Sequence, residues 1–433
     1  RGLRRQWDTL DVWFDSGAAW RAVPGAANAD FVIEGSDQHR GWFQTSLLTA
    51  LASGGTAAPY RHVVTHGMVL DSKGRKMSKS LGNVVDPEHL IAEHGADALR
   101  AWVGEVDVRR DVTASEALFA VARAKLKKTR NTFRFLLGVL GSDVAESRRA
   151  GETVQASDLR PLDRLLLARV HEATRAIGKA YADADAKQAA VLLHSLAAGD
   201  ISAVWGAAVR DRLYCDAGGS AGRASALAAA QGALIGLLRA TAPLLPALAD
   251  EVWSHILATF GTEPLPANAT PDFLTESPGG PIPDAWSLSD LEAAAGPALA
   301  VRDAANGLAD TARKASFIGS SSDAMLVLSG PGLSVLTSPP SLFVFEDDVA
   351  ELCTVSEVAY GDADALEPVA GDSLLGHTII PSLLPAASSS AAALSVSLCR
   401  PSGHRCPRCW RHLAPTPEAL CRRCEEVRPT PDS

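Results

Sequence analysis

The chain has 433 residues, of which 47% are hydrophobic and 21% are charged, and its formal net charge is −9. This ordinary globular composition excludes a mainly disordered chain, a collagen-like repeat and a coiled-coil rod, and the length predicts roughly three domains. The absence of a long uncharged apolar run disfavours a transmembrane protein. The acidic total argues against a uniformly basic nucleic-acid-binding protein but allows local basic patches.

The N-terminal region predicts a parallel sheet. Residues 31–33 and 62–64 are short apolar runs typical of buried strands, and residues 40–51 between them have helical spacing. A strand, a helix and a strand at this spacing predict a βαβ unit. Polar residues that follow the two strands would then share the edge at which such sheets bind ligands.

The middle of the chain predicts an α-helical bundle. Apolar residues recur at helical spacing in four stretches, at residues 162–181, 187–209, 224–238 and 250–260. From residue 261 the composition changes, and a Pro- and Gly-rich linker is followed by a small α+β region with strands predicted at residues 324–328 and 342–345. Residues 385–395 are rich in Ala and Ser and predict a tether.

The predicted fold class is α/β plus α, with six segments along the chain. They are a partial Rossmann-like domain (1–86), a connecting segment (87–115), the helical bundle (116–260), the linker (261–284), the α+β region with its tether (285–395) and a cysteine-rich tail (396–433).

Four of the seven cysteines form the pattern Cys-x2-Cys-x11-Cys-x2-Cys, namely Cys406, Cys409, Cys421 and Cys424. Four thiolates meet the tetrahedral requirement of a structural zinc ion, and a long chain with this pattern indicates one zinc site rather than a disulfide framework. The arginines around the cysteines offset the negative charge of such a site, and their surplus suits a phosphate backbone. Trp410 either stacks on a base or packs the knuckle, and packing is the favoured interpretation.

Residues 71–83 form a cationic loop in which Lys73, Arg75, Lys76 and Lys79 alternate with Gly and Ser. The attraction between a positive charge and a phosphate oxygen about 4 Å away is about 4 kcal/mol at an effective dielectric constant of ~20. A polyphosphate is therefore the natural ligand of this loop. On composition alone, a solvated surface loop is the more common case.

The literal sequence of this loop, Lys76-Met77-Ser78-Lys79-Ser80, resembles the KMSKS signature of class I aminoacyl-tRNA synthetases. The stretches DVWFDSG (11–17) and EGSDQHRGWF (34–43), the segment after the loop and the cysteine tail resemble the isoleucyl-tRNA synthetase family. The resemblance implies activation of isoleucine by ATP, with Mg²⁺ accompanying the ATP, and transfer of the isoleucyl group to tRNA(Ile).

The resemblance also assigns roles to individual residues. Lys76 and Lys79 would steady the phosphates during adenylate formation, and Lys79 is the stronger candidate. Glu34 would contact the adenylate, and two tryptophans would wall the isoleucine side chain. The pocket as a whole would consist of Glu34, Gly35, Asp37, Gln38, Trp13, Trp42 and His66. Without the resemblance, ordinary packing is the alternative for both tryptophans and for His66.

Two further stretches concern RNA. Residues 122–134 form a basic helix without an acidic residue, which fits either RNA backbone contact or a solvated helix face. The resemblance places it at the opening of an anticodon-binding bundle. Residues 210–214 match a family stretch in that bundle, and we interpret them as structural, with Arg212 as a weaker RNA candidate.

The sequence departs from the family in two ways, because it contains no His-x-Gly-His (HIGH) motif and no inserted editing domain. We therefore expect an incomplete portion of a longer or split enzyme, inactive without an N-terminal half in the same or a partner chain. The alternative is a non-catalytic tRNA-binding module that keeps the bundle and the zinc tail. The expected location is the cytoplasm, with an organelle as the alternative.

Overall fold

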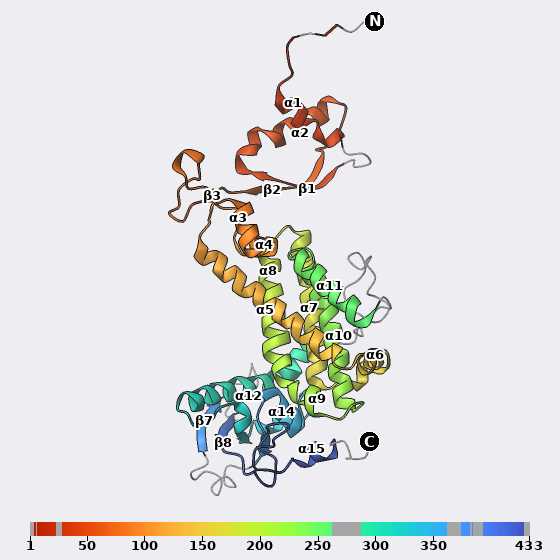
Figure 1. The fold of residues 1–433 in the computed structure, drawn as a ribbon, viewed down its shortest axis with the longest axis vertical. Helices are drawn as coiled ribbons and strands as arrows, with labels where there is room; N and C mark the ends of the chain where they lie inside the picture. Colours follow the sequence, from red (N-terminus) through yellow and green to blue (C-terminus); the bar gives the residue numbers. More distant parts are fainter. Residues whose placement is uncertain are drawn as a thin grey trace. The chain divides into compact units, whose positions relative to one another are not determined.

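The computed structural model describes residues 4–5, 7–22, 28–261, 287–361, 374–381, 383 and 393–427 (Figure 1). The chain divides into two compact units, residues 1–126 with 180–190 and residues 127–179 with 191–433. Most of the predicted linker and residues 385–392 of the predicted tether lie outside the described residues.

The first unit contains the predicted βαβ arrangement. Strand β1 (Ala29–Gly35) and strand β2 (Tyr60–His66) are parallel, and helix α2 (Trp42–Ala52) connects them. The pairing runs from Ala29 opposite Tyr60 to Gly35 opposite His66. Both strands therefore end at the same edge of this sheet, as the sequence predicts.

A short helix, α1 (Val12–Gly17), packs against α2. Its first turn is capped by the Asp11 carboxylate, which accepts a hydrogen bond from the Trp13 backbone N–H at 2.8 Å. A Cβ at Gly17 would lie 2.8 Å from the Cβ of Thr45, so only glycine permits this close approach of the two helices.

A second pair of parallel strands consists of β3 (Val69–Leu70) and β4 (Val112–Thr113). The KMSKS loop and two helices lie between these strands in the sequence. The loop leads into a 3-10 turn (Lys79–Leu81), then α3 (Pro87–His94) and α4 (Ala96–Glu105). Asp86 caps α3 and Pro87 occupies its first turn, which is the usual chemistry of a helix start.

The second unit contains the predicted helical bundle. Helix α5 (Glu116–Gly141) begins in the first unit and continues here, followed by α6 (Val144–Thr153), α7 (Pro161–Ala182), α10 (Ala221–Thr241) and α11 (Pro246–Phe260). Helix α10 is the central helix, because it contacts α6, α9 (Arg210–Cys215) and α11 and buries residues on every side. Its length and apolar composition would also suit a membrane span, but 61% of the relevant window is buried in the unit.

One predicted helix is not continuous in the structure. Residues 187–209 were predicted as one helix, whereas the structure has α8 (Ala186–His194), a π-helical segment (Ser195–Gly206) and α9 (Arg210–Cys215). A Cβ at Gly206 would lie 2.8 Å from the Ile201 carbonyl oxygen and 3.1 Å from the Phe135 ring. The Ile201 carbonyl belongs to the π turn itself, whereas the Phe135 ring comes from α5 and packs closely against the segment. Apolar spacing does not separate a π turn from an α turn.

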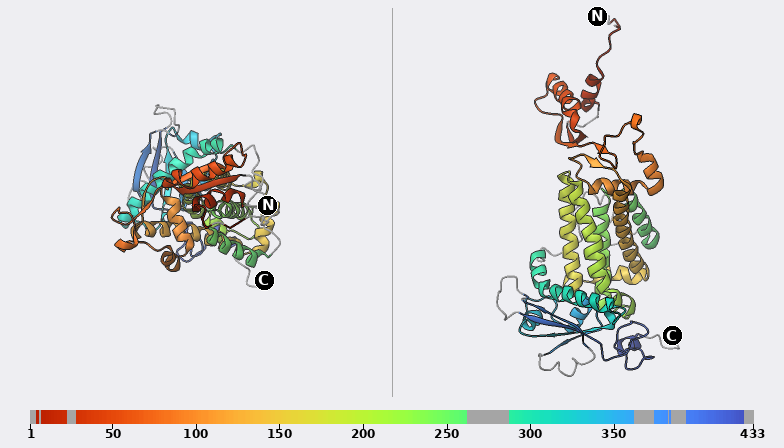
Figure 2. Two further views of the ribbon diagram at one scale, coloured as in Figure 1. Left: turned by 90° about the horizontal axis from the view of Figure 1, so that it is seen from above. Right: turned by 90° about the vertical axis from the view of Figure 1, so that its left-hand side faces the viewer.

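The α+β region follows, with helix α12 (Leu288–Lys314) lying across a four-stranded sheet of order β6-β5-β8-β7 (Figure 2). The strands are β5 (Met325–Ser329), β6 (Glu357–Tyr360), β7 (Leu374–Ile380) and β8 (Leu394–Cys399).

Two details of the prediction for this region were wrong. Residues 342–345 form no strand, because Phe343 is buried at the irregular entry to α14 (Glu346–Cys353). Leu394 and Ser395, assigned to the tether, belong to β8.

Candidate adenylate and metal sites

The end of β1 places two of the predicted pocket residues. Glu34 lies opposite Thr65 in the sheet and is half-buried, and within the described residues its carboxylate forms no hydrogen bond or ion pair. Gly35 lies opposite His66, and a Cβ at this position would sit 2.5 Å from a carboxylate oxygen of Asp37. A side chain at Gly35 would therefore displace the Asp37 carboxylate at the start of the following 3-10 helix (Ser36–Arg40).

That 3-10 helix orders the next residues through side-chain contacts. The Gln38 amide donates to Asp37 at 3.2 Å, and its oxygen accepts from the Trp42 backbone N–H at 3.3 Å. Trp42 donates from Nε1 to the Ser16 carbonyl at 2.8 Å, which joins α2 to α1. The exposed carboxylate of Asp37 is consequently held near the β1 edge by its neighbours.

Trp13 and His66 complete the predicted group. The Trp13 ring lies over Gly41, where a Cβ would come within 3.0 Å of it, and the indole is 42% exposed. His66 ends β2, and its Nδ1 lies 2.8 Å from the Gly67 carbonyl oxygen, so that nitrogen donates.

The KMSKS loop is closed at its base by Asp71 and Asn83, two residues to which sequence reasoning gave no role. The Asn83 amide donates to the Asp71 carboxylate at 2.9 Å, and its oxygen accepts from the Ser78 backbone N–H at 2.9 Å. Asp71 also accepts from Arg75 Nε at 2.9 Å and from the backbone N–H groups of Arg75 and Lys73. These hydrogen bonds hold the pKa of the Asp71 carboxyl well below its usual range.

The structure orders this loop without joining it to residues 34–43. Lys76 pairs with Leu70 in an antiparallel bridge, Ser78 contacts the Ser80 hydroxyl at 3.2 Å, and Met77 is half-buried. Among the described side chains no hydrogen bond or ion pair connects Lys76–Ser80 with the Glu34 group, and the Lys79 side chain lies outside what is described. Convergence of the two stretches on one adenylate therefore stays a prediction.

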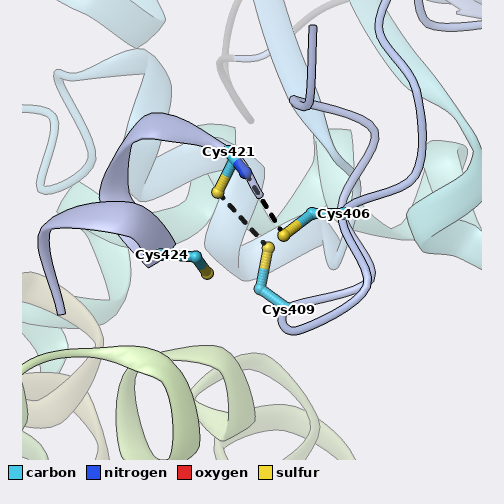
Figure 3. A group of neighbouring side chains, drawn as sticks. All are labelled: Cys406, Cys409, Cys421 and Cys424. Carbon is cyan, nitrogen blue, oxygen red and sulfur yellow. Dashed lines mark hydrogen bonds between the residues drawn. The ribbon is translucent and has the colours of Figure 1, made fainter. Parts of the chain in front are cut away.

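The four cysteines of the tail come together as the spacing predicts. Their sulfurs lie within 4.8 Å of one another, and Figure 3 shows them facing a common centre. Cys406 and Cys409 come from one turn, whereas Cys421 precedes α15 (Arg422–Glu426) and Cys424 lies within it. The 3.7 Å between the sulfurs of Cys409 and Cys421 fits tetrahedral zinc, because Zn–S bonds of about 2.3 Å place ligand sulfurs roughly 3.8 Å apart.

The surroundings of the cysteines favour ionisation of one thiol and oppose that of two others, since burial raises the pKa of Cys409 and of Cys424. Although burial opposes ionisation of the Cys406 thiol, the backbone N–H groups of Cys409, Cys421 and Arg408 lower its pKa to about 6. A thiolate is the form that binds zinc. With four sulfur ligands no coordination position would remain open, so the fit is to a structural ion.

The structure does not decide between the two alternatives predicted for Trp410. Its indole is 60% exposed and its backbone has φ of 65°, with the Arg405 guanidinium 5.2 Å from the ring centroid. The ring therefore contacts the knuckle through Arg405 and leaves much of its surface exposed. It lines a cavity of about 980 Å³ within the second unit, to which Arg210, Tyr214 and Arg408 also contribute.

The basic helix is less basic than its sequence suggests. Arg123 pairs with Glu116, Lys125 with Glu105, and Arg130 with Glu251. The exposed cations for which the described residues supply no ion pair are Lys127, Lys128 and Arg134.

Arg212, the weaker RNA candidate, is not available to RNA. Its side chain is only 4% exposed and donates to Asp163 at 2.8 and 3.0 Å and to Glu351 at 2.7 Å. Burial raises the pKa of Glu351 to about 7, even though Arg212 opposes that shift. Asp163 and Glu351 lie 49 and 139 residues from Arg212, so no local pattern indicates this cluster.

Two family models match the chain. The model for tRNA synthetases class I (I, L, M and V) matches residues 1–115, and the model for the anticodon-binding domain of tRNA ligase matches residues 163–323. Together with the KMSKS loop and the helical bundle, these matches define the chain as part of a class I aminoacyl-tRNA synthetase.

Curated relatives narrow the family. The mitochondrial isoleucine–tRNA ligase of Mus musculus is 34% identical over 97% of this chain and 41% of its own length. The enzymes of Desulforudis audaxviator and Brevibacillus brevis are 34% and 35% identical, each over 98% of this chain and 43% of the relative. The chain belongs to the isoleucine–tRNA ligase family, and it spans about two fifths of the length of these relatives.

A solved structure of Mycobacterium tuberculosis methionyl-tRNA synthetase bound by methionyl-adenylate covers 60% of this chain and 50% of its own. At 20% identity and a TM-score of 0.45, this overlap is too loose to place any site residue.

Proposed function

We propose that this chain supplies the KMSKS part of an isoleucine–tRNA ligase, which forms isoleucyl-adenylate from isoleucine and ATP and transfers the isoleucyl group to tRNA(Ile). The observation that carries the proposal is the identity of about one third to isoleucine–tRNA ligases across 97–98% of the chain. The hydrogen-bonded base of the KMSKS loop supports it, because a loop that only faced solvent would have no need of such ordering.

In this proposal the chemistry needs no covalent enzyme nucleophile. The isoleucine carboxylate attacks the α-phosphorus of ATP, and pyrophosphate leaves with the electrons of the broken P–O bond. Lys76 and Lys79 stabilise the charge that grows on the leaving phosphates, and the unpaired Glu34 carboxylate holds the substrate. Mg²⁺ would accompany the phosphates of ATP, and zinc at the four cysteines would hold the tail in shape.

Lys79 provides the direct test. In a complete isoleucine–tRNA ligase that carries this sequence, Lys79→Ala should slow ATP–pyrophosphate exchange by about 100-fold, equivalent to about 2.7 kcal/mol, while isoleucine binding stays nearly unchanged. Lys73→Ala, on the same loop, is the matched control. An unchanged exchange rate in Lys79→Ala would rule out the assigned role.

The activity of the chain alone is a separate test. We expect ATP–pyrophosphate exchange at background level with the purified chain, because its sequence contains no HIGH motif. The resemblance to the family implies that this motif supplies the other half of the ATP site. Turnover above background refutes that expectation.

The second candidate is a tRNA-binding module without catalytic use, and the exposed Lys127, Lys128 and Arg134 favour it as a function of the isolated chain. Binding to tRNA that weakens steeply with salt, combined with no ATP binding, would support the module. A cytoplasmic location remains a prediction.

A further inference from the structure

Two adjacent residues of α9 hold two different parts of the second unit. Arg212 reaches Asp163 on α7 and Glu351 on α14 of the α+β region. Its neighbour Asp211 accepts hydrogen bonds at 2.7 Å from two guanidinium nitrogens of Arg423 in the cysteine tail. Consecutive side chains on a helix point in different directions, so one short helix can contact both parts.

The contact between Asp211 and Arg423 fixes the orientation of the two side chains relative to each other. Arg423 bonds both oxygens of the carboxylate, which is the bidentate geometry that fixes the two planes relative to each other. Arg411 approaches the same carboxylate at 3.5 Å, and Arg423 also lies 3.3 Å from Asp216. These groups are partly buried, so water screens them less than exposed pairs.

The cysteine tail is held a second time by the α+β region. The Ser356 carbonyl accepts from Arg411 Nε at 3.0 Å, and the Ser356 hydroxyl accepts from the His412 backbone N–H at 2.7 Å. The His412 ring lies 3.3 Å from Asp323. Each of the three parts, the bundle, the α+β region and the tail, is therefore hydrogen-bonded to the other two. We call this set of contacts the circuit.

The position of the cations in the sequence links this circuit to the metal ligands. Arg423 lies between Cys421 and Cys424, and Arg411 follows Cys409 by two residues. A metal that fixes the four sulfurs also fixes the starting points of both guanidinium side chains. The cavity lined by Trp410, Arg408 and Tyr214 lies between the parts that the circuit joins.

We propose that Asp211 and Arg212 are positioning residues that lock the cysteine tail and the α+β region onto the helical bundle, and so set the shape of the cavity between them, whose lining by Arg210, Arg408 and Trp410 suits RNA. This inference rests on the proposed function only for the identity of the ligand as tRNA. Arg212 fixes the α+β side of the cavity, and Asp211 fixes the tail side through Arg423. Both residues also line the cavity, and the role proposed for them is to hold its walls through their bonds to Glu351 and Arg423.

The test uses the full chain with zinc bound. The variants are Asp211→Asn, Arg423→Met and both together, with Asp211→Glu to restore the charge. The matched control is Glu426→Gln, which removes a similar ion pair on α15 that faces solvent, between Arg422 and Glu426. Three quantities are measured: the zinc content, the hydrogen exchange of the His412 amide and the affinity for tRNA.

We expect Asp211→Asn and Arg423→Met each to speed exchange of the His412 amide and to weaken tRNA binding by roughly tenfold, about 1.4 kcal/mol, with zinc content unchanged. The double variant should lose clearly less than the sum of the two single losses, because both changes remove the pair between Asp211 and Arg423, and each loses only a longer contact besides, to Arg411 or to Asp216. Asp211→Glu should recover most of the loss, and Glu426→Gln should behave as the unmodified chain.

Additive effects of the two single changes, or an unchanged His412 amide in Asp211→Asn, would overturn the proposal. If the unmodified chain binds no tRNA, the proposed function fails, while the exchange measurement still decides the positioning role. Loss of zinc from Asp211→Asn would likewise count against it, because the residue would then support the metal site instead of the docked position.

Discussion

Replacing Asp163 by asparagine should destabilise the second unit more than any change of a surface charge. Asp163 is fully buried and accepts hydrogen bonds from Arg212 at 2.8 and 3.0 Å, from Trp205 Nε1 at 2.7 Å and from the Ser225 hydroxyl. Asparagine keeps the size but removes the charge, and its amide turns a donor toward other donors. Breaking a buried ion pair by removing one partner costs about 3–5 kcal/mol, because the other charge stays buried.

The assay follows urea unfolding by hydrogen exchange of peptides from α7 and α9, which isolates this unit in a chain of several parts. Asp310→Asn is the control, because its pair with Arg313 has side chains that are 61% and 44% exposed. Such a pair is worth about 0–1 kcal/mol. A loss below about 1 kcal/mol in Asp163→Asn, similar to the control, would refute the view that the buried cluster holds α7 and α9 together.

Three further changes test separate parts of the molecule. Because burial raises the pKa of Glu351 from 4.5 to about 7, the folded chain binds a proton that the unfolded chain releases, so the free energy of unfolding should fall as pH rises across this window. Glu351→Gln should remove that slope in urea titrations, and a persistent slope would contradict the assignment. Asn83→Ala should slow adenylate formation about tenfold in a complete enzyme by releasing the KMSKS loop, with isoleucine affinity unchanged as the control measurement. Chelation of zinc, or Cys421→Ser, should abolish the protection of the Cys406 amide while α10 stays protected, and equal loss in both places would argue against a local structural role.

The sequence predicted the elements whose signals are local. Strands β1 and β2, helix α2 and the four-cysteine cluster rest on apolar runs, helical spacing and ligand spacing, and all of them are confirmed. Each of these patterns lies within a short window of the chain. Local physics therefore suffices for them.

Features that depend on distant partners could not be predicted in the same way. The π-helical segment leaves no signal in the apolar spacing of residues 187–209, and the burial of Arg212 follows from carboxylates 49 and 139 residues away. An arginine in a polar stretch looks exposed when its partners are unknown. Asp71 and Asn83 are different, because an Asp that precedes a Gly-containing turn is a local signal for side-chain to backbone bonds and could have been used.

The ion pairs also change how the charge of this chain relates to RNA. Counting arginines and lysines from the sequence treats every cation as available, but Arg123, Lys125 and Arg130 are neutralised by carboxylates and Arg212 is buried. Buried ion pairs seldom add net stability, since desolvation offsets the attraction. Their value here is then geometric: a charge that can be satisfied in only one arrangement fixes how helices meet. The cations left for a phosphate backbone are fewer than composition implies, and a salt-dependence slope for tRNA binding should reflect that smaller number.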